Sequence, residues 1–169
     1  MYIILERKIE GAHMNKDVII NVRGNQMDGV TQEQNAIELI TEGKYYKKGD
    51  NYYITYKESE VTGMEGTTTT LKVSKDVVTL MRFGKINSQF VFQRGQRHQS
   101  FYDTEFGSFH IGVYADKVEI KMNENGGEIR VGYEMEIDNH SSGRNDFHMF
   151  IREAGSSNEK HIGGHTQAN

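Results

Sequence analysis

The sequence contains no cysteine among its 169 residues. This absence excludes disulfide bonds, thiolate zinc sites and cysteine nucleophiles. It also fits the reducing environment of the cytosol, because disulfide bonds are mainly a feature of secreted proteins. A single domain of this length buries enough surface to fold without such a cross-link.

A concentration of basic residues is missing as well. The formal net charge is -4, and the lysine and arginine residues are scattered along the chain. Domains that bind nucleic acid usually carry a clustered basic patch or stripe. The composition therefore argues against nucleic acid as a partner.

Long apolar runs are also absent, and none approaches the ~20 residues that a membrane-spanning helix needs. Near the N-terminus the apolar run Ile3-Ile4-Leu5 is followed at once by Glu6, Arg7 and Lys8. This run is too short for a signal peptide, and its charges lie on the wrong side. We therefore predict a cytoplasmic protein that is not associated with a membrane.

The two ends of the chain differ from the part between them. Glu10-Gly11 can be encoded by a purine-rich stretch that resembles a ribosome-binding site, with Met14 as the native start. We therefore expect a non-native or disordered leader at 1–14, although an ordered arm is the alternative. The last residues lack apolar periodicity, which predicts a disordered tail at 155–169 and one domain at 15–154.

Two neighbouring segments show apolar residues at every second position. Residues 117–122 read K-V-E-I-K-M, and residues 128–137 read E-I-R-V-G-Y-E-M-E-I. A period of two is typical of a β-strand with one face buried and the other in water. The connection NENGG at 123–127 supplies the Asn and Gly residues that hairpin turns favour. The pattern therefore predicts an antiparallel hairpin.

Similar short segments fill most of the chain and are separated by tight turns, a spacing typical of all-β barrels and sandwiches. Tight turns make neighbours in sequence into antiparallel neighbours in the sheet. Because closure hides the sheet edges, we predict an all-β fold, a single closed up-and-down barrel of about 8–10 strands. The remaining predicted strands lie approximately at 17–25, 35–47, 51–58, 67–74, 76–83, 88–94, 98–103, 107–115 and 145–153.

A run of four threonines, Thr67 to Thr70, belongs to one of these strands. Threonine is β-branched and suits a pleated, half-buried surface. The residues Ser-Lys-Asp at 74–76 then form a turn, and the apolar segment 77–83 is the returning strand. The threonine run is therefore interpreted as one half of a β-hairpin.

Several short motifs occur in a fixed order along the predicted strands. They are Tyr56 and Glu58, Leu71-Lys72 after the threonines, Met81-Arg82-Phe83-Gly84, Phe92, Gly95, and Tyr102 to Gly107. Together they resemble the YwiB-like family of Gram-positive bacterial proteins over about residues 17–153. The resemblance implies a calycin-type, lipocalin-like β-barrel, and it brings no catalytic residues.

Three charged residues lie on the same predicted face of their strands as the apolar side chains. Glu58 follows Tyr56, Arg82 follows Leu80, and Arg94 follows Phe92, each at a spacing of two. A buried arginine needs a partner, so an arginine–carboxylate cluster inside the barrel would anchor an anionic group. The alternative is that all three lie at strand ends and extend to the rim.

A second candidate lies in the segment 94–107. Arg97, His98 and Tyr102 could bind a phosphate or a carboxylate at the barrel mouth. The alternative is structural, with Asp103 and Thr104 shaping a turn and Tyr102 packing across the strand. Arginine interleaved with aromatic residues also occurs in proteins that bind single-stranded nucleic acid, but the acidic balance argues against it.

The histidines do not indicate a metal site. His98 and His110 lie on different predicted strands, without an acidic third ligand at a suitable spacing. His161 and His165 fall in the glycine-rich tail, where adventitious binding is the simpler reading. We therefore predict no metal and no cofactor.

Three functions fit these observations. The leading hypothesis is a protein that binds a small apolar or amphipathic ligand in the cavity or mouth of the barrel. The second is an enzyme for small molecules that uses the Arg/His/Tyr cluster at the mouth. The third is a homodimer formed through aromatic residues on the predicted solvent faces. These aromatic residues are Tyr53, Phe83, Tyr114 and Phe150.

Overall fold

The computed structural model describes residues 14–155, which form ten β-strands and one short 3-10 helix. The strands are β1 (Met14–Met27), β2 (Gln34–Lys48), β3 (Asn51–Lys57), β4 (Thr67–Val73), β5 (Val77–Gly84), β6 (Asn87–Gln93), β7 (Arg97–Thr104), β8 (Gly107–Asn123), β9 (Gly126–Ile137) and β10 (His140–Glu153), and the helix is η1 (Glu60–Thr62). In this part of the chain, no helix has the length and apolar character needed to span a membrane.

The expected leader and tail lie outside the described residues, except at their inner ends. Met14 is the first residue of β1 and pairs with Lys47 of β2, so it belongs to the barrel. Gly155 forms part of a turn directly after β10.

The ten strands form a closed antiparallel barrel in which each strand pairs with its neighbours in sequence. Closure comes from β10, which pairs with β1 from Val18↔Glu153 to Met27↔Arg144. The predicted up-and-down barrel is therefore confirmed. The threonine hairpin is confirmed too, because β4 pairs with β5 from Thr67↔Gly84 to Val73↔Val78.

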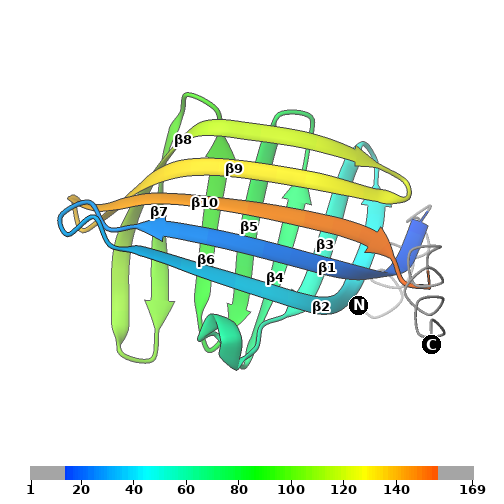
Figure 1. The fold of residues 1–169 in the computed structure, drawn as a ribbon, viewed down its shortest axis with the longest axis horizontal. Coiled ribbons are helices and arrows are strands. Elements are labelled where there is room, and N and C mark those ends of the chain that lie inside the picture. The colour runs from blue at the N-terminus through cyan, green and yellow to red at the C-terminus, as the bar shows by residue number, and fades with distance from the viewer. Residues whose placement is uncertain (1–13, 156–169) are drawn as a thin grey trace, which may run out of the picture.

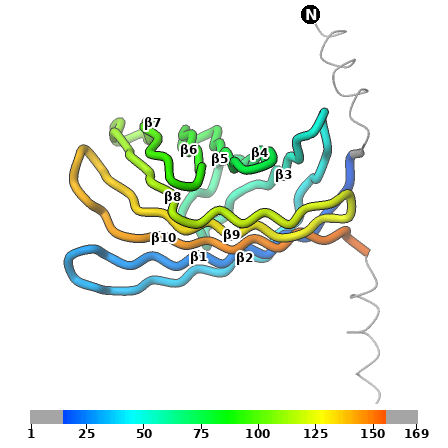
Figure 2. The backbone as a smooth tube through the Cα atoms, turned by 90° about the horizontal axis from the view of Figure 1, so that it is seen from above, coloured from blue at the N-terminus to red at the C-terminus, as the bar shows by residue number. Residues whose placement is uncertain are grey.

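The barrel is flattened into two layers that cross each other. Figure 1 shows the long strands β1, β2, β8, β9 and β10 running across the shorter strands β3 to β7. Figure 2 shows the same two layers from above, joined at their sides. At one join, β2 stays paired with β1 up to Lys47 and also pairs with β3 from Gly43 onward, where Gly43 faces Tyr56. A Cβ at Gly43 would lie 2.4 Å from the Thr55 carbonyl oxygen, so only glycine allows this close approach.

One predicted boundary is wrong. The segments 107–115 and 117–122 were expected to be two strands, but they form the single strand β8. The register of β8 against β9 shifts between Ala115 and Lys117, which is a β-bulge. Because a bulge adds one residue, the inward phase moves from Ile111 and Val113 to Val118 and Ile120. In the sequence, the apolar residues change from odd-numbered to even-numbered positions, and a turn between two strands would interrupt the alternation in the same way.

The barrel wall is weakest between β6 and β7. Their ladder contains only the pairs Asn87↔Asp103 and Ser88↔Tyr102, although both strands are longer than this. Beyond Ser88 the two strands separate, and the end of β6 approaches β8 instead through the bridge Arg94↔Ala115.

The apolar core fills one end of the barrel. Tyr45 is fully buried there, its ring stacks on Tyr52 at 5.4 Å, and its hydroxyl donates a hydrogen bond to the Asn123 carbonyl oxygen at 2.6 Å. This bond joins β2 to the end of β8 and closes the barrel at that end. Other side chains with no more than 1% exposure are Val18, Ile20, Ile54, Leu71, Val73, Val78, Phe92, Val113, Ile129, Val131 and Met149.

Candidate functional site

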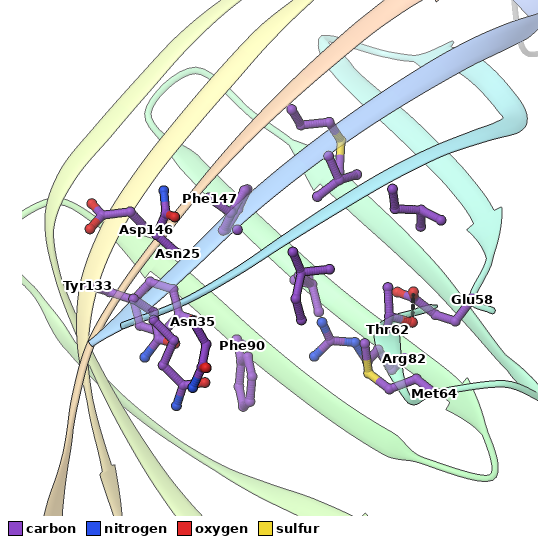
Figure 3. Close-up of a pocket in the computed structure, with 18 of the residues that line it drawn as sticks. Asn25, Asn35, Glu58, Thr62, Met64, Arg82, Phe90, Tyr133, Asp146 and Phe147 are labelled. Atoms are coloured by element: carbon purple, nitrogen blue, oxygen red, sulfur yellow. Dashed lines mark hydrogen bonds between the residues drawn. The ribbon is translucent and has the colours of Figure 1, made fainter. Parts of the chain in front are cut away.

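The opposite end of the barrel is open and contains a hollow of about 230 Å³. Its walls come from β1, β2, β3, β5, β6, β9, β10 and the segment around η1. Figure 3 shows Glu58 and Thr62 on one side of this hollow and Tyr133 and Asn35 on the other. We call this space the mouth hollow. Its polar lining residues are Asn25, Gln26, Asn35, Tyr56, Glu58, Thr62, Arg82, Tyr133, Asn145 and Asp146, and its apolar ones include Val22, Ile37, Leu39, Met64, Leu80, Phe90, Phe147 and Met149.

Glu58 is held in place by two hydroxyl groups. It lies directly after β3 with 7% exposure, at the point where the chain turns into η1. The Thr69 hydroxyl donates to one carboxylate oxygen at 2.6 Å, and the Thr62 hydroxyl donates to the other at 2.8 Å. Thr69, an inward residue of β4, therefore stabilises the buried carboxylate of Glu58.

Arg82 projects from β5 into the middle of the mouth hollow (Figure 3). Its guanidinium carbon lies 6.0 Å from the centre of the Phe90 ring, within the range of a cation–π contact. Its Nε atom is buried without a hydrogen-bond partner. Within residues 14–155, no carboxylate lies within 4.0 Å of this guanidinium as an ion-pair partner.

Ser88 and Asn145 also carry buried polar atoms without a partner. Ser88 lies directly opposite Arg82 in the ladder between β5 and β6, is 9% exposed, and has an unpartnered Oγ. Asn145 projects inward from β10 and lines the mouth hollow with an unpartnered Nδ2. Buried polar groups are nearly always hydrogen-bonded in folded proteins. Two of these residues, Arg82 and Asn145, line the mouth hollow, and Ser88 lies beside Arg82 in the ladder but outside that lining.

The same hollow perturbs two tyrosines. Burial, and next the Glu58 carboxylate, raise the pKa of Tyr56 well above its ordinary value. Burial raises the pKa of Tyr133 to about 12. The positive charge of Arg82 acts in the opposite direction and lowers the pKa of both phenols. Both phenols are therefore neutral hydrogen-bonding groups at neutral pH.

A second hollow, of about 360 Å³, adjoins the first. Phe90 and Tyr133 line both spaces. The Phe90 ring stacks on Tyr102 at 6.4 Å, so these two side chains form one wall. We call this space the apolar hollow. Its lining residues are Phe90, Tyr102, Phe109, Ile111, Tyr133, Met135 and Ile137.

The structure brings together only part of the residue set predicted from the sequence. Glu58 and Arg82 both line the mouth hollow, and Tyr102 lines the apolar hollow. Arg94 does not project inward as its phase predicted, because β6 ends at Gln93 and the chain turns at Gly95 with φ 77°. Arg94 is exposed at an outer hollow beside Asp116.

Arg97, His98 and Tyr102 do not form a cluster. Arg97 faces outward and pairs with Glu136 at 2.5 Å. His98 faces inward and contacts the Gln93 side chain at 3.3 Å. Tyr102 also faces inward, but four residues along an extended strand place it roughly 13 Å from His98. These three residues therefore do not form the cluster that the enzyme hypothesis requires.

The outer aromatic residues are distributed over both layers of the barrel. Phe83 lies on β5 and is 59% exposed, whereas Phe150 lies on β10 and is 40% exposed. The Tyr53 ring stacks on Tyr46 at 4.9 Å. Phe83 and Phe150 lie on different layers, so these residues do not form one aromatic patch (Figure 1). The homodimer stays a prediction.

Sequence reasoning missed Ser88, Thr69 and Asn145, although a signal was present. Ser88 shares its phase with Phe90, and Asn145 shares its phase with Phe147. The phase argument was applied only to charged residues. Applied to uncharged polar residues as well, it would have placed all three inside the barrel.

Metal-binding groups do not form a cluster in the described part of the chain. Among residues 14–155, no group of three or more His, Asp or Glu side chains is placed to hold a metal ion. The donors around the mouth hollow are instead mostly neutral amides and hydroxyls with one guanidinium.

The fold and the mouth define the class of protein: a closed antiparallel β-barrel with a polar hollow at one end. A family model described as "Domain of unknown function (DUF1934)" matches residues 20–149, and the chain belongs to this family. The resemblance stated from the motifs is thereby confirmed.

A curated relative supports the same assignment. The chain is 29% identical over 104 residues to the uncharacterized beta-barrel protein YwiB of Bacillus subtilis (strain 168), which covers 62% of this chain and 72% of that protein. The crystal structure of the ywiB protein from Bacillus subtilis matches with a TM-score of 0.76 and 22% identity. That match covers 86% of this chain and 97% of the other. At this identity the structural match shows the fold.

Proposed function

We propose that this protein binds a small amphipathic molecule in the mouth of its barrel. The observation that carries the proposal is Arg82, whose side chain enters the mouth hollow without a carboxylate partner in the described chain. Arg82 is half-buried and its Nε is withdrawn from water without a partner, and leaving a buried donor unsatisfied is costly. A bound molecule that accepts hydrogen bonds from Arg82 offsets this cost.

The lining of the mouth hollow supports the same proposal. Apolar side chains such as Leu80 and Met149 lie beside the amides and hydroxyls that surround Arg82. Binding sites for small molecules are typically concave and mostly apolar, with a few polar groups that fix orientation. Because drug-sized ligands occupy about 300–1,000 Å³, a hollow of about 230 Å³ suits a smaller molecule or one end of a longer one.

Gly24 offers a direct test. It lies in β1 on the wall of the mouth hollow, and a Cβ added there meets no atom within 4 Å. Valine at this position fills the hollow and suits a strand better than glycine. We expect Gly24→Val to keep or raise the Tm while the affinity for the bound molecule falls at least about tenfold.

Native mass spectrometry checks this expectation. The protein and its variants are purified from the natural source, and a bound small molecule is expected in the wild type and absent from Gly24→Val. Gly112→Val is the matched control, because Gly112 lies on the outer face beside the flexible ends of Gln99 and Glu136. Bare wild-type protein, or equal retention of the molecule by Gly24→Val, would contradict the proposal.

A further inference from the structure

We infer that the molecule bound at the mouth is a monocarboxylate with an unbranched apolar chain, its carboxylate bonded to Arg82 and its chain extending into the apolar hollow. This inference rests on the proposed function and adds the chemical class of the ligand and a second subsite.

The first argument concerns hydrogen bonding. Arg82 Nε and Asn145 Nδ2 are buried donors without partners, and the unpartnered Ser88 hydroxyl is a third group able to donate. Arg82 on β5 and Asn145 on β10 line the mouth hollow, and Ser88 on β6 lies directly opposite Arg82 in the ladder. Donors without acceptors are matched by an anion, and a carboxylate offers two oxygens to a guanidinium in bidentate geometry.

The second argument concerns charge. Among the described residues, Arg82 is the one cation that lines the mouth hollow, while Glu58 and Asp146 also line it. Glu58 already accepts hydrogen bonds from Thr62 and Thr69, so it remains a fixed negative neighbour. A phosphate monoester carries about -1.5 to -2 charges at pH 7, which one guanidinium cannot balance beside these carboxylates. A single negative charge fits the site better.

The third argument concerns the path from one hollow to the other. The Arg82 guanidinium lies over Phe90, and Phe90 lines both hollows and stacks on Tyr102 in the second. An anion on Arg82 therefore has a continuous aromatic wall beside it that leads to Met135 and Ile137. All the side chains of the apolar hollow are aliphatic or aromatic, with Tyr102 and Tyr133 as the only hydroxyl carriers. An unbranched hydrocarbon chain gains about 0.8 kcal/mol of binding free energy there for each methylene that it buries.

Isothermal titration calorimetry with three ten-carbon probes tests the head group. The probes are decanoate, decan-1-ol and decyl phosphate, each titrated into delipidated full-length protein. We expect decanoate to bind at least about tenfold more tightly than either of the others, a difference of about 1.4 kcal/mol. Arg82→Met should remove this preference by weakening decanoate alone. Arg94→Met is the matched control, because Arg94 is exposed outside both hollows.

The chain subsite has its own test. Phe109 lines the apolar hollow from β8, whereas Phe101 points outward from the adjacent strand with 64% exposure. We expect Phe109→Ala to weaken decanoate at least about fivefold and to leave butanoate unchanged, because the shorter chain does not reach this hollow. Phe101→Ala should bind both carboxylates as the wild type does.

The outcomes separate the inference from the function on which it rests. Equal affinity for decanoate and decan-1-ol, unaffected by Arg82→Met, would overturn the carboxylate while leaving a ligand-binding mouth. Tighter binding of decyl phosphate would identify a phosphate ligand instead. Failure of all three probes, in a protein whose native mass spectrum shows another bound molecule, would overturn the inference alone. Failure of the probes with bare protein in every preparation would overturn both.

Discussion

The two ends of the barrel are built from the same strands but have different interiors. Along β3 the inward residues change from Ile54 to Glu58, and along β5 they change from Val78 to Arg82. The alternation of inward and outward residues continues along each strand. Toward the mouth, however, the inward residues are polar instead of apolar. Alternation decides which face is inside, and the residue type along that face decides which end is packed with apolar side chains and which end is open and polar.

This difference separates stability from function. At the packed end, side chains gain free energy by leaving water and by contacting one another. At the mouth, buried polar groups depend on hydrogen bonds, and several of them have no partner within the described protein. Substitutions at the packed end should therefore change the free energy of unfolding most, and substitutions at the mouth should mainly change binding.

The largest effect is expected from Phe92→Ala at the packed end. Phe92 is fully buried, and its ring contacts those of Tyr133 and Phe147 at 4.7 and 5.7 Å. Its removal leaves a cavity and should lower the free energy of unfolding by about 3–5 kcal/mol, measured by urea denaturation. The exposed Phe101→Ala is the control and should change it by no more than about 0.5 kcal/mol. Equal losses for the two variants would remove the contrast between core and surface.

Glu58→Ala should have an intermediate effect at the mouth. It removes the acceptor for the fully buried Thr69 hydroxyl, and leaving a buried donor unsatisfied costs about 1–3 kcal/mol. In the Thr69→Val background the loss should shrink, because that hydroxyl is gone; a double-mutant cycle by urea denaturation measures this coupling. Glu60→Ala, at an exposed position in η1, is the control. Additive losses would show that Thr69 does not support Glu58.

Tyr45→Phe tests the closure of the packed end with a smaller change. The ring stays, and only the hydrogen bond to the Asn123 carbonyl oxygen is lost. We expect the free energy of unfolding to fall by about 0.5–1.5 kcal/mol, with a matching fall in Tm. Tyr46→Phe, at the neighbouring outward position, should have no effect. If both variants behave alike, the hydroxyl of Tyr45 does not join β2 to β8 in solution.

The smallest effect on stability is expected from Arg82→Met. Arg82 is half-buried and has no ion-pair partner among the described residues, and replacing a buried ion pair or charge by an apolar side chain of similar volume is often neutral or stabilising. The ligand-free variant should therefore unfold at the same urea concentration as the wild type or a higher one. A loss greater than about 2 kcal/mol would mean that Arg82 holds the mouth together, and the comparison between the two ends would then fail.

Most of the fold was predictable because alternation is a local property of the sequence. The hairpin of Thr67–Val73 with the following strand, and the order of strands around the barrel, follow from short turns and a period of two. The bulge at Asp116 was not predictable in the same way. It changes the inward phase within one strand, and only pairing with β9 shows that β8 continues through it.

The site was predictable in part, for the same reason. Phase placed Glu58 and Arg82 on the inner face, and both line the mouth hollow. The same argument was wrong for Arg94, because β6 ends at Gln93, one residue before Arg94. Alternation also cannot show that Arg82 and Asn145 line the same hollow, because they lie on β5 and β10, which are not neighbours in the sheet.

The short ladder between β6 and β7 has a consequence for how a molecule enters and leaves. With only two residue pairs joining them, these strands have fewer backbone hydrogen bonds to break than any other neighbours in the barrel. Phe90 and Tyr102, which stack across this seam, line the apolar hollow. Local opening follows the lowest free-energy route, so the seam can part while the remaining ladders stay intact. For the molecule that we propose binds in the barrel, this seam is therefore the expected route of entry and exit.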